Sequence, residues 1–196
     1  MPLTDLEEHA LGRTWVVEEP MERAYHALVD DGRVWLVDPL DRGLEEIEGL
    51  GEPAGVLQLL DRHNRDCAEV AARFGVPHLK VPDAVPGSPF GAIPVVRLPG
   101  WKETALWWPE REALIVAETL AANPMHTGGD QPVAVHFVLR AWPPGALRKY
   151  RPQHLLLGHG HSLHGAAAAD GLETAYARSR RDLPRVLLKL PGSVRS

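Results

Sequence analysis

Short apolar runs of strand type recur along this chain, and each is closed by glycine, proline or a charged residue. In the first half they cover residues 34–39 (VWLVDP), 55–60 (GVLQLL) and 77–82 (PHLKVP). Between them, residues 43–52 (GLEEIEGLGE) and 67–75 (CAEVAARFG) carry apolar residues at helical spacing and are closed by glycine. This β-α-β-α-β order predicts a layered fold of sheets and helices.

Further strands and helices are predicted before and after this β-α-β-α-β unit. The further strand-type segments are residues 14–19, 24–31, 93–100 and 154–160, and the two arms of a β-hairpin within residues 103–120 that turns at PERE (109–112). Two helices are predicted in the second half. One covers residues 133–142, and the other runs roughly over residues 165–181 with an interruption at Gly171.

Bulk properties exclude several classes of protein. The 196 residues suit a single domain over residues 1–196, and the net charge of −5 argues against a nucleic-acid-binding surface. No window approaches ~18 uninterrupted apolar residues, so we expect no membrane span. Cys67 is the only cysteine, which excludes an intrachain disulfide and suits a reducing compartment. The acidic N-terminal residues do not form a secretory signal, so a cytoplasmic location is expected.

Potential metal ligands and proton carriers follow several of the predicted strands. LLDRHNRDC, residues 59–67, comes directly after one strand, and Glu118 stands at the end of another. LLLGHGHSLHG, residues 155–165, places His159 and His161 on a glycine-containing turn. Ligands in layered α/β folds bind at strand C-termini, so these groups are expected at one edge.

The order of these segments resembles the metallo-β-lactamase superfamily. The residues around 59–67 resemble its T-H-x-H-x-D-H signature, and VWLVDP resembles its strand that ends in an aspartate, here Asp38. ALIVAETL resembles its strand ending in Gly-Asp, and HLLLGHGHSLHG its final Gly-His-Gly turn. The resemblance runs from about Thr14 to Gly165. It implies an α+β fold, a four-layer αββα sandwich in a compact version.

Carrying the family's ligands over residue by residue shows a damaged signature. The first two histidines fall on Arg62 and Asn64, and the family's middle histidine falls on Trp101. Arginine is permanently cationic and tryptophan only donates, so the metal position that would use these residues is expected to be empty. The remaining ligands implied by the resemblance fall on Asp66, Cys67, Glu118 and His159.

Each residue of that second set can bind zinc, so the cofactor prediction is either none or one zinc ion. The candidate residues lining the site are Arg62, His63, Asn64, Trp101 and His161. Without metal, Arg62 is expected to fill the cavity and pair with Glu118 or Asp66.

Two functions follow from these alternatives. The first is a metallo-β-lactamase-fold protein with a degenerate site, without two-metal hydrolase activity and with a binding, regulatory or structural role. The second is a single-zinc hydrolase of a small ester, thioester or related substrate. A small-molecule ligand and a homodimer are compatible with both, and neither involves nucleic acid or a membrane. The sequence names no substrate.

Overall fold

The N-terminal half of the chain forms a six-stranded sheet. The computed structural model describes residues 4–47, 49–186 and 188. The strands are β1 (Thr4–His9), β2 (Gly12–Val17), β3 (Ala24–Asp30), β4 (Arg33–Val37), β5 (Glu52–Gln58) and β6 (His78–Lys80), adjacent in that order. Pairing is antiparallel from β1 to β4 and parallel from β4 to β6. The parallel pairs place the C-terminal ends of β4 and β5 at the same edge.

A second sheet comes from the other half. Its strands are β7 (Gly91–Leu98), β8 (Trp101–Trp108), β9 (Ala113–Val116), β12 (His154–Leu157) and β13 (Leu163–His164), in the order β13-β12-β9-β8-β7. β9 and β12 run parallel, so their C-terminal ends also share an edge. A separate short pair joins β10 (Leu120–Ala121) to β11 (Ala134–Val135).

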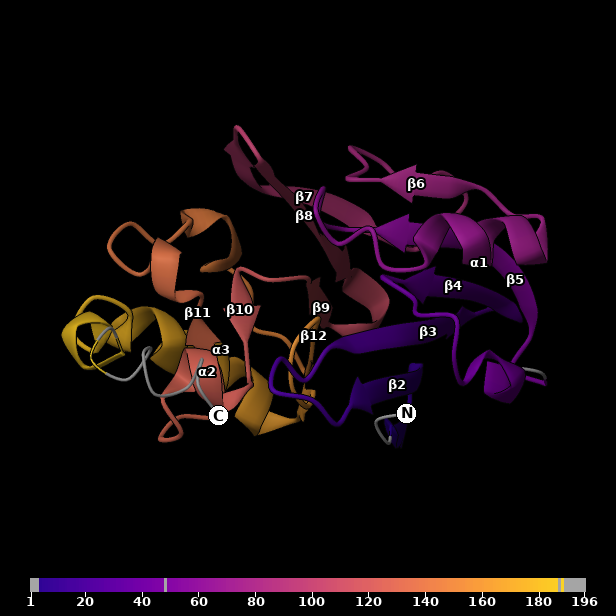
Figure 1. Cartoon of the computed structure of the whole chain (residues 1–196). Coiled ribbons are helices and arrows are strands. Elements are labelled where there is room, and N and C mark those ends of the chain that lie inside the picture. The colour runs from indigo at the N-terminus through magenta and orange to yellow at the C-terminus, as the bar shows by residue number, and fades with distance from the viewer. Residues whose placement is uncertain (1–3, 48, 187, 189–196) are drawn as a thin grey trace.

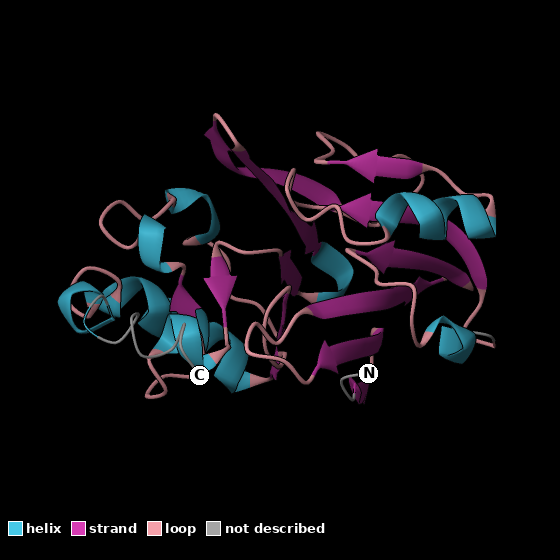
Figure 2. Cartoon of the chain, in the orientation of Figure 1, coloured by secondary structure: helices cyan, strands magenta, loops and turns pink. Residues whose placement is uncertain are grey.

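Helices cover the outer sides of the two sheets (Figures 1 and 2). The helices are α1 (Cys67–Phe74), α2 (Pro124–Thr127) and α3 (Ala166–Arg178), with 3₁₀ turns η1 (Leu44–Ile47), η2 (Pro109–Arg111), η3 (Phe137–Leu139) and η4 (Gly145–Leu147). Figure 1 shows α1 against β4 and β5, and α3 on the opposite side of the molecule. No helix in the described residues has the length and apolar character needed to cross a bilayer.

Strand alternation divides the apolar side chains of β4 between two cores. Trp35 and Val37 point into the core shared with the second sheet. Val34 and Leu36 point to the opposite side, which α1 covers with the side chains of Cys67, Val70 and Ala71. Side chains in a strand alternate between faces, so one apolar run supplies both layers. The α+β sandwich expected from the sequence is therefore confirmed.

Three predicted helices differ from the structure. Residues 133–142 form β11 and the turn η3 instead of a helix, because Ala134 and β-branched Val135 pair with β10. The predicted helix over residues 43–52 is reduced to η1, Glu52 already belongs to β5, and residue 48 lies outside the described part. The last helix is continuous through Gly171, where a Cβ would meet Leu163 Cδ1 at 2.8 Å. Glycine at that position allows close packing of α3. A further difference is the strand β1, which was not predicted from the sequence.

Candidate metal site

Four strand ends meet at one edge and supply a cluster of polar side chains. Asp38 follows β4 in a left-handed conformation with φ of 46°, and its Oδ1 accepts a hydrogen bond from the Leu59 N–H at 3.0 Å. His63 follows β5, Glu118 follows β9 and His159 follows β12. Arg65 ties these ends together, because its guanidinium donates to the carbonyls of Ala24, Asp38 and Gly158.

His63 and His159 face each other through their Nε2 atoms, which are 3.3 Å apart. The Nδ1 of His159 lies 2.9 Å from the Met21 carbonyl, and the Nδ1 of His63 lies 3.4 Å from Asp38 Oδ2. Burial raises the pKa of Asp38, but the hydrogen bond and positive charge of His63 outweigh it and hold that pKa below its usual range. Both partners are therefore acceptors, so each Nδ1 carries a hydrogen.

Two Nε2 lone pairs would then point at each other unless a cation or a shared proton lies between them. Burial, with the nearby charges of Arg65 and His63, lowers the pKa of His159 to about 3. His159 is thus held in its neutral form at ordinary pH, which is the form that binds metals. The bridging positive charge must come from a proton on the pair or from a metal ion.

Glu118 supplies a carboxylate beside this pair. Its Oε2 accepts from Arg62 Nη2 at 2.9 Å and Nε at 3.2 Å, and lies 4.0 Å from His63 Nε2. Its Oε1 lies 3.4 Å from His136 Nε2. Burial raises the pKa of Glu118, but the His136 hydrogen bond, the charges of His63 and His136 and the Arg62 contact outweigh it, so the pKa lies well below its usual range.

Glu103, wholly buried on β8, fixes the backbone that carries Glu118. Its carboxylate accepts from the N–H groups of Glu118 and Thr119 at 3.0 Å and from the Thr119 hydroxyl at 2.7 Å. Burial raises the pKa of Glu103, while these donors act in the opposite direction. The orientation of Glu118 therefore depends on an inner carboxylate, which no feature of the sequence indicated.

His63, Glu118 and His159 form the group of potential metal ligands found among the described residues. Their ligand atoms lie within 4.8 Å of one another. Two nitrogens at 2.0–2.1 Å from a tetrahedral zinc ion lie about 3.3 Å apart, which matches the Nε2 separation. Acceptors behind both Nδ1 atoms are the usual support for metal-binding histidines. The donor set therefore fits one divalent ion with a coordination position left open.

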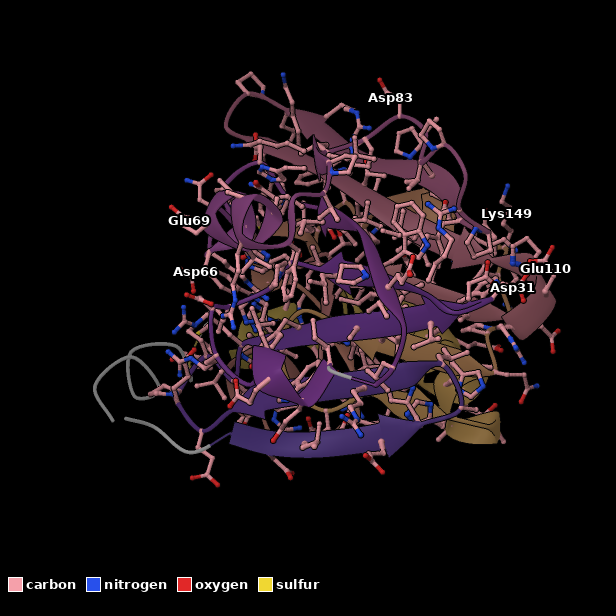
Figure 3. The ribbon with its side chains drawn as sticks, turned by 90° about the vertical axis from the view of Figure 1, so that its right-hand side faces the viewer. Asp31, Asp66, Glu69, Asp83, Glu110 and Lys149 are labelled. Atoms are coloured by element: carbon pink, nitrogen blue, oxygen red, sulfur yellow. The ribbon has the colours of Figure 1, made fainter. Side chains whose placement is uncertain are left out.

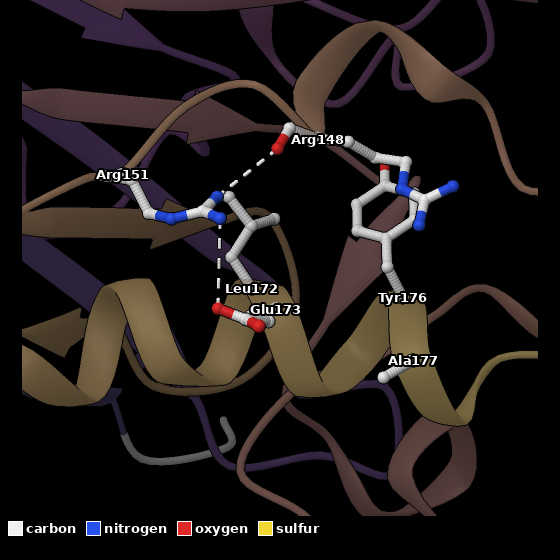
Figure 4. Close-up of a pocket in the computed structure, with 6 residues that line it drawn as sticks. All are labelled: Arg148, Arg151, Leu172, Glu173, Tyr176 and Ala177. Atoms are coloured by element: carbon white, nitrogen blue, oxygen red, sulfur yellow. Dashed lines mark hydrogen bonds and ion pairs between the residues drawn. The ribbon is translucent and has the colours of Figure 1, made fainter.

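Arg62 stands at the mouth of this group. Its guanidinium lies 4.0 Å from the centre of the Trp101 ring, and its side chain is 43% exposed. The surrounding pocket has a volume of about 370 Å³ and is lined by Met21, Arg23, Arg62, His63, Arg65, Glu118 and His159. A separate cavity of about 190 Å³ beside α3 shares no lining residue with it (Figure 4).

The chain is similar to several solved structures. The DIM-1 metallo-β-lactamase superposes with a TM-score of 0.53 at 13% identity, covering 91% of this chain and 99% of its own. The apo state of the chemotaxis sensor ODP from T. denticola gives 0.55 at 14% identity, with 90% and 94% covered. A peroxy diiron species of chemotaxis sensor ODP gives 0.57 at 15% identity, with 89% and 94% covered. This chain has the metallo-β-lactamase fold. No protein-family model and no curated protein sequence matches it.

Within this metallo-β-lactamase fold, the four ligands carried over by resemblance do not meet. Glu118 and His159 lie in the site, but Asp66 Oδ2 accepts from the Asp41 N–H at 2.8 Å. Figure 3 shows Asp66 at the edge of the molecule beside α1. Cys67, the first residue of α1, is buried, and its sulfur lies 3.9 Å from the His63 carbonyl oxygen. Burial raises the pKa of its thiol.

Some of the predicted lining residues lie at the site and others lie outside it. Arg62, His63 and Trp101 gather at the site. Asn64 is exposed and accepts from Lys80 Nζ at 3.0 Å, and His161 is paired with Glu7 at 2.6 Å. The sequence placed His63 at a variable position of the signature, and it gave no role to Met21, Glu103 or His136. The one available indication was the histidine inside a loop that already resembled a metal-binding signature.

Proposed function

We propose that this metallo-β-lactamase-fold protein binds one divalent metal ion on His63, Glu118 and His159 and does not perform two-metal hydrolysis. The observation that carries the proposal is the pair of Nε2 atoms facing each other at 3.3 Å. Each is fixed in that direction by an acceptor behind its ring. A divalent ion would replace the shared proton and gain a carboxylate from Glu118.

Arg62 is the reason for excluding a second metal. Its guanidinium binds Glu118 and stacks on Trp101, and a permanent cation there repels a further divalent ion. Asn64 is exposed and its Oδ1 accepts a hydrogen bond from Lys80, so it is not part of the group of potential metal ligands. The ligands that a two-metal centre needs are therefore replaced by groups that stabilise the pocket without an ion.

One bound zinc ion would supply Lewis acidity to a substrate carbonyl or phosphoryl group. The protein's own groups then have separate tasks. Asp38 and the Met21 carbonyl orient the two imidazoles, His136 and Glu103 hold Glu118, and Arg62 faces the open pocket where it can bind an anionic group or a developing oxyanion. If the site is catalytic, a small ester or thioester is the expected substrate class.

A metal-free binding protein is the second candidate, and the Arg62–Glu118 ion pair favours it. That pair places a guanidinium on the one carboxylate of the pocket, which satisfies Glu118 without metal. The chemotaxis sensor among the similar structures has the same fold, so the fold itself does not select an enzyme.

Metal content separates the two candidates. Protein purified without chelator is analysed for zinc, iron and manganese per chain by mass spectrometry. About one ion per chain is expected, lost in His63→Ala and His159→Ala and retained in Asp66→Asn and His161→Ala. The two control positions lie in the same loops but outside the ligand group. Absence of metal, together with an unfolding temperature that added zinc does not change, would leave the metal-free candidate.

A further inference from the structure

We propose that the pocket binds a small anion, a carboxylate or a phosphate group, on Arg62, and that this binding and metal binding strengthen each other through Glu118. The inference rests on the proposed metal site. It adds a ligand class and a coupling that the metal site alone does not require.

The coupling follows from how the two oxygens of Glu118 are used. Oε1 faces His136 Nε2 at 3.4 Å. Oε2 is the oxygen within 4.0 Å of His63 Nε2, and it is also the oxygen that accepts both hydrogen bonds from Arg62. The carboxylate oxygen that faces His63 is therefore occupied by the guanidinium of Arg62, which competes with a metal ion for it.

Arg62 can leave Glu118 without disturbing the core. Its side chain is 43% exposed, and among the described residues it is held by Glu118 and the Trp101 ring. Stacking on an aromatic face allows a guanidinium to turn in its plane while it keeps the contact. An anion entering from solvent can thus take over the hydrogen bonds that Arg62 now gives to Glu118.

Arg62 is the guanidinium of the pocket that is able to receive such an anion. Arg23 also lines the pocket but is ion-paired with Glu19. Arg65 is fixed by three backbone carbonyls and by the nearby charge of the Asp38 carboxylate. A planar guanidinium binds carboxylate and phosphate groups through two parallel hydrogen bonds, and a volume of about 370 Å³ suits a small molecule.

Linkage makes the two effects reciprocal. An anion that draws Arg62 away frees Oε2 for the metal, and a metal on Oε2 weakens the hold of Glu118 on Arg62. The same factor must then appear in both affinities, and coupling between binding sites is typically about 5- to 150-fold.

The test measures zinc affinity by competition with a chromophoric chelator. Titrations use chloride buffer alone, or chloride partly replaced by acetate or by inorganic phosphate at constant ionic strength, with chelator blanks for each anion. Wild type is expected to bind zinc at least about 5-fold more tightly with the anion that Arg62 recognises. Comparing acetate with phosphate identifies which of the two anion classes is preferred.

Arg62→Gln is the decisive variant. It should bind zinc more tightly than wild type in chloride and show no response to either anion. Arg151→Gln, which removes the same charge beside the separate cavity of Figure 4, should behave like wild type. If zinc binds but Arg62→Gln changes neither the affinity nor the anion response, the coupling is wrong while the metal site stands. If neither wild type nor Arg62→Gln binds zinc, the metal site itself is wrong and the coupling falls with it.

Discussion

The Nε2 atoms of His63 and His159 face each other at 3.3 Å, and each ring is held in that orientation by an acceptor at its Nδ1. This relationship determines the protonation of the pair. Because both Nδ1 atoms carry hydrogens, the metal-free pair needs one further proton between its Nε2 atoms. The same position, with Glu118 beside it, is where a metal ion would bind.

Zinc binding should therefore release a proton. The ion would displace a proton shared by the two imidazoles, so zinc affinity should fall as the pH is lowered. Calorimetric titration in buffers of different ionisation enthalpy measures the number of protons released per zinc. A value near one is expected, and a value of zero with zinc bound would contradict the shared proton.

Asp38→Asn should weaken zinc binding by about 10- to 100-fold, because it removes the charge that orients His63. The asparagine oxygen can still accept the Leu59 N–H that Asp38 Oδ1 accepts now, so the fold should be retained. Zinc competition measures the affinity, and circular dichroism checks the fold. An unchanged affinity would show that Asp38 only stabilises the strand end.

A layered arrangement of sheets and helices could be predicted from the order of apolar runs, because each buried strand is short, continuous and closed by a breaker. The αββα sandwich itself was implied by the family resemblance. The placement of Arg62, Glu118 and His159 at one edge also follows from strand ends. The direction of His63 does not, since the loop that carries it depends on left-handed conformations at Asp38 and Arg65, with φ of 46° and 45°. Nothing in the identity of either residue demands that conformation.

The separation of Asp66 and Cys67 from the site was, in contrast, partly visible in the sequence. Cys67, Val70 and Ala71 have the i, i+3, i+4 spacing of a buried helix face, and all three lie in the core. Asp66, directly before that helix, then turns toward Asp41 at the surface. The helix pattern and the resemblance to a metal-binding signature therefore point in opposite directions at Cys67, and the structure follows the helix pattern.

Cys67 should be chemically inert in the folded protein. It is completely buried and burial raises the pKa of its thiol, so little thiolate forms at neutral pH. Iodoacetamide should label the native chain very slowly and the urea-unfolded chain to one equivalent. Rapid labelling of the native chain would instead support a role for this thiol in the site.

Acid should destabilise the protein through buried neutral histidines. Burial, with the nearby charges of His9 and Arg65, lowers the pKa of His26 to about 3, and its Nδ1 is 2.8 Å from the Thr14 hydroxyl. A folded pKa below the unfolded value near 6.5 means that unfolding takes up a proton. This stability is complete above pH 6.5 and is lost as the pH falls toward 3. Unfolding temperatures of wild type and His26→Gln between pH 7 and pH 4 should differ in slope, with the flatter dependence in the variant.

Glu103→Gln should lower the free energy of unfolding by about 1–3 kcal/mol, the typical result of leaving a buried donor without its acceptor. Both carboxylate oxygens of Glu103 accept from the Glu118–Thr119 segment, so the amide NH₂ of glutamine would face a donor. Urea unfolding measures the loss. Glu118 would also lose its fixed orientation. The zinc affinity of the same variant, measured while the chain is folded, should therefore fall. Thr104→Ser, a conservative change at the adjacent buried position, is the matched control and should keep the zinc affinity of wild type. Loss of stability with unchanged zinc affinity would show that Glu103 supports the fold without positioning Glu118.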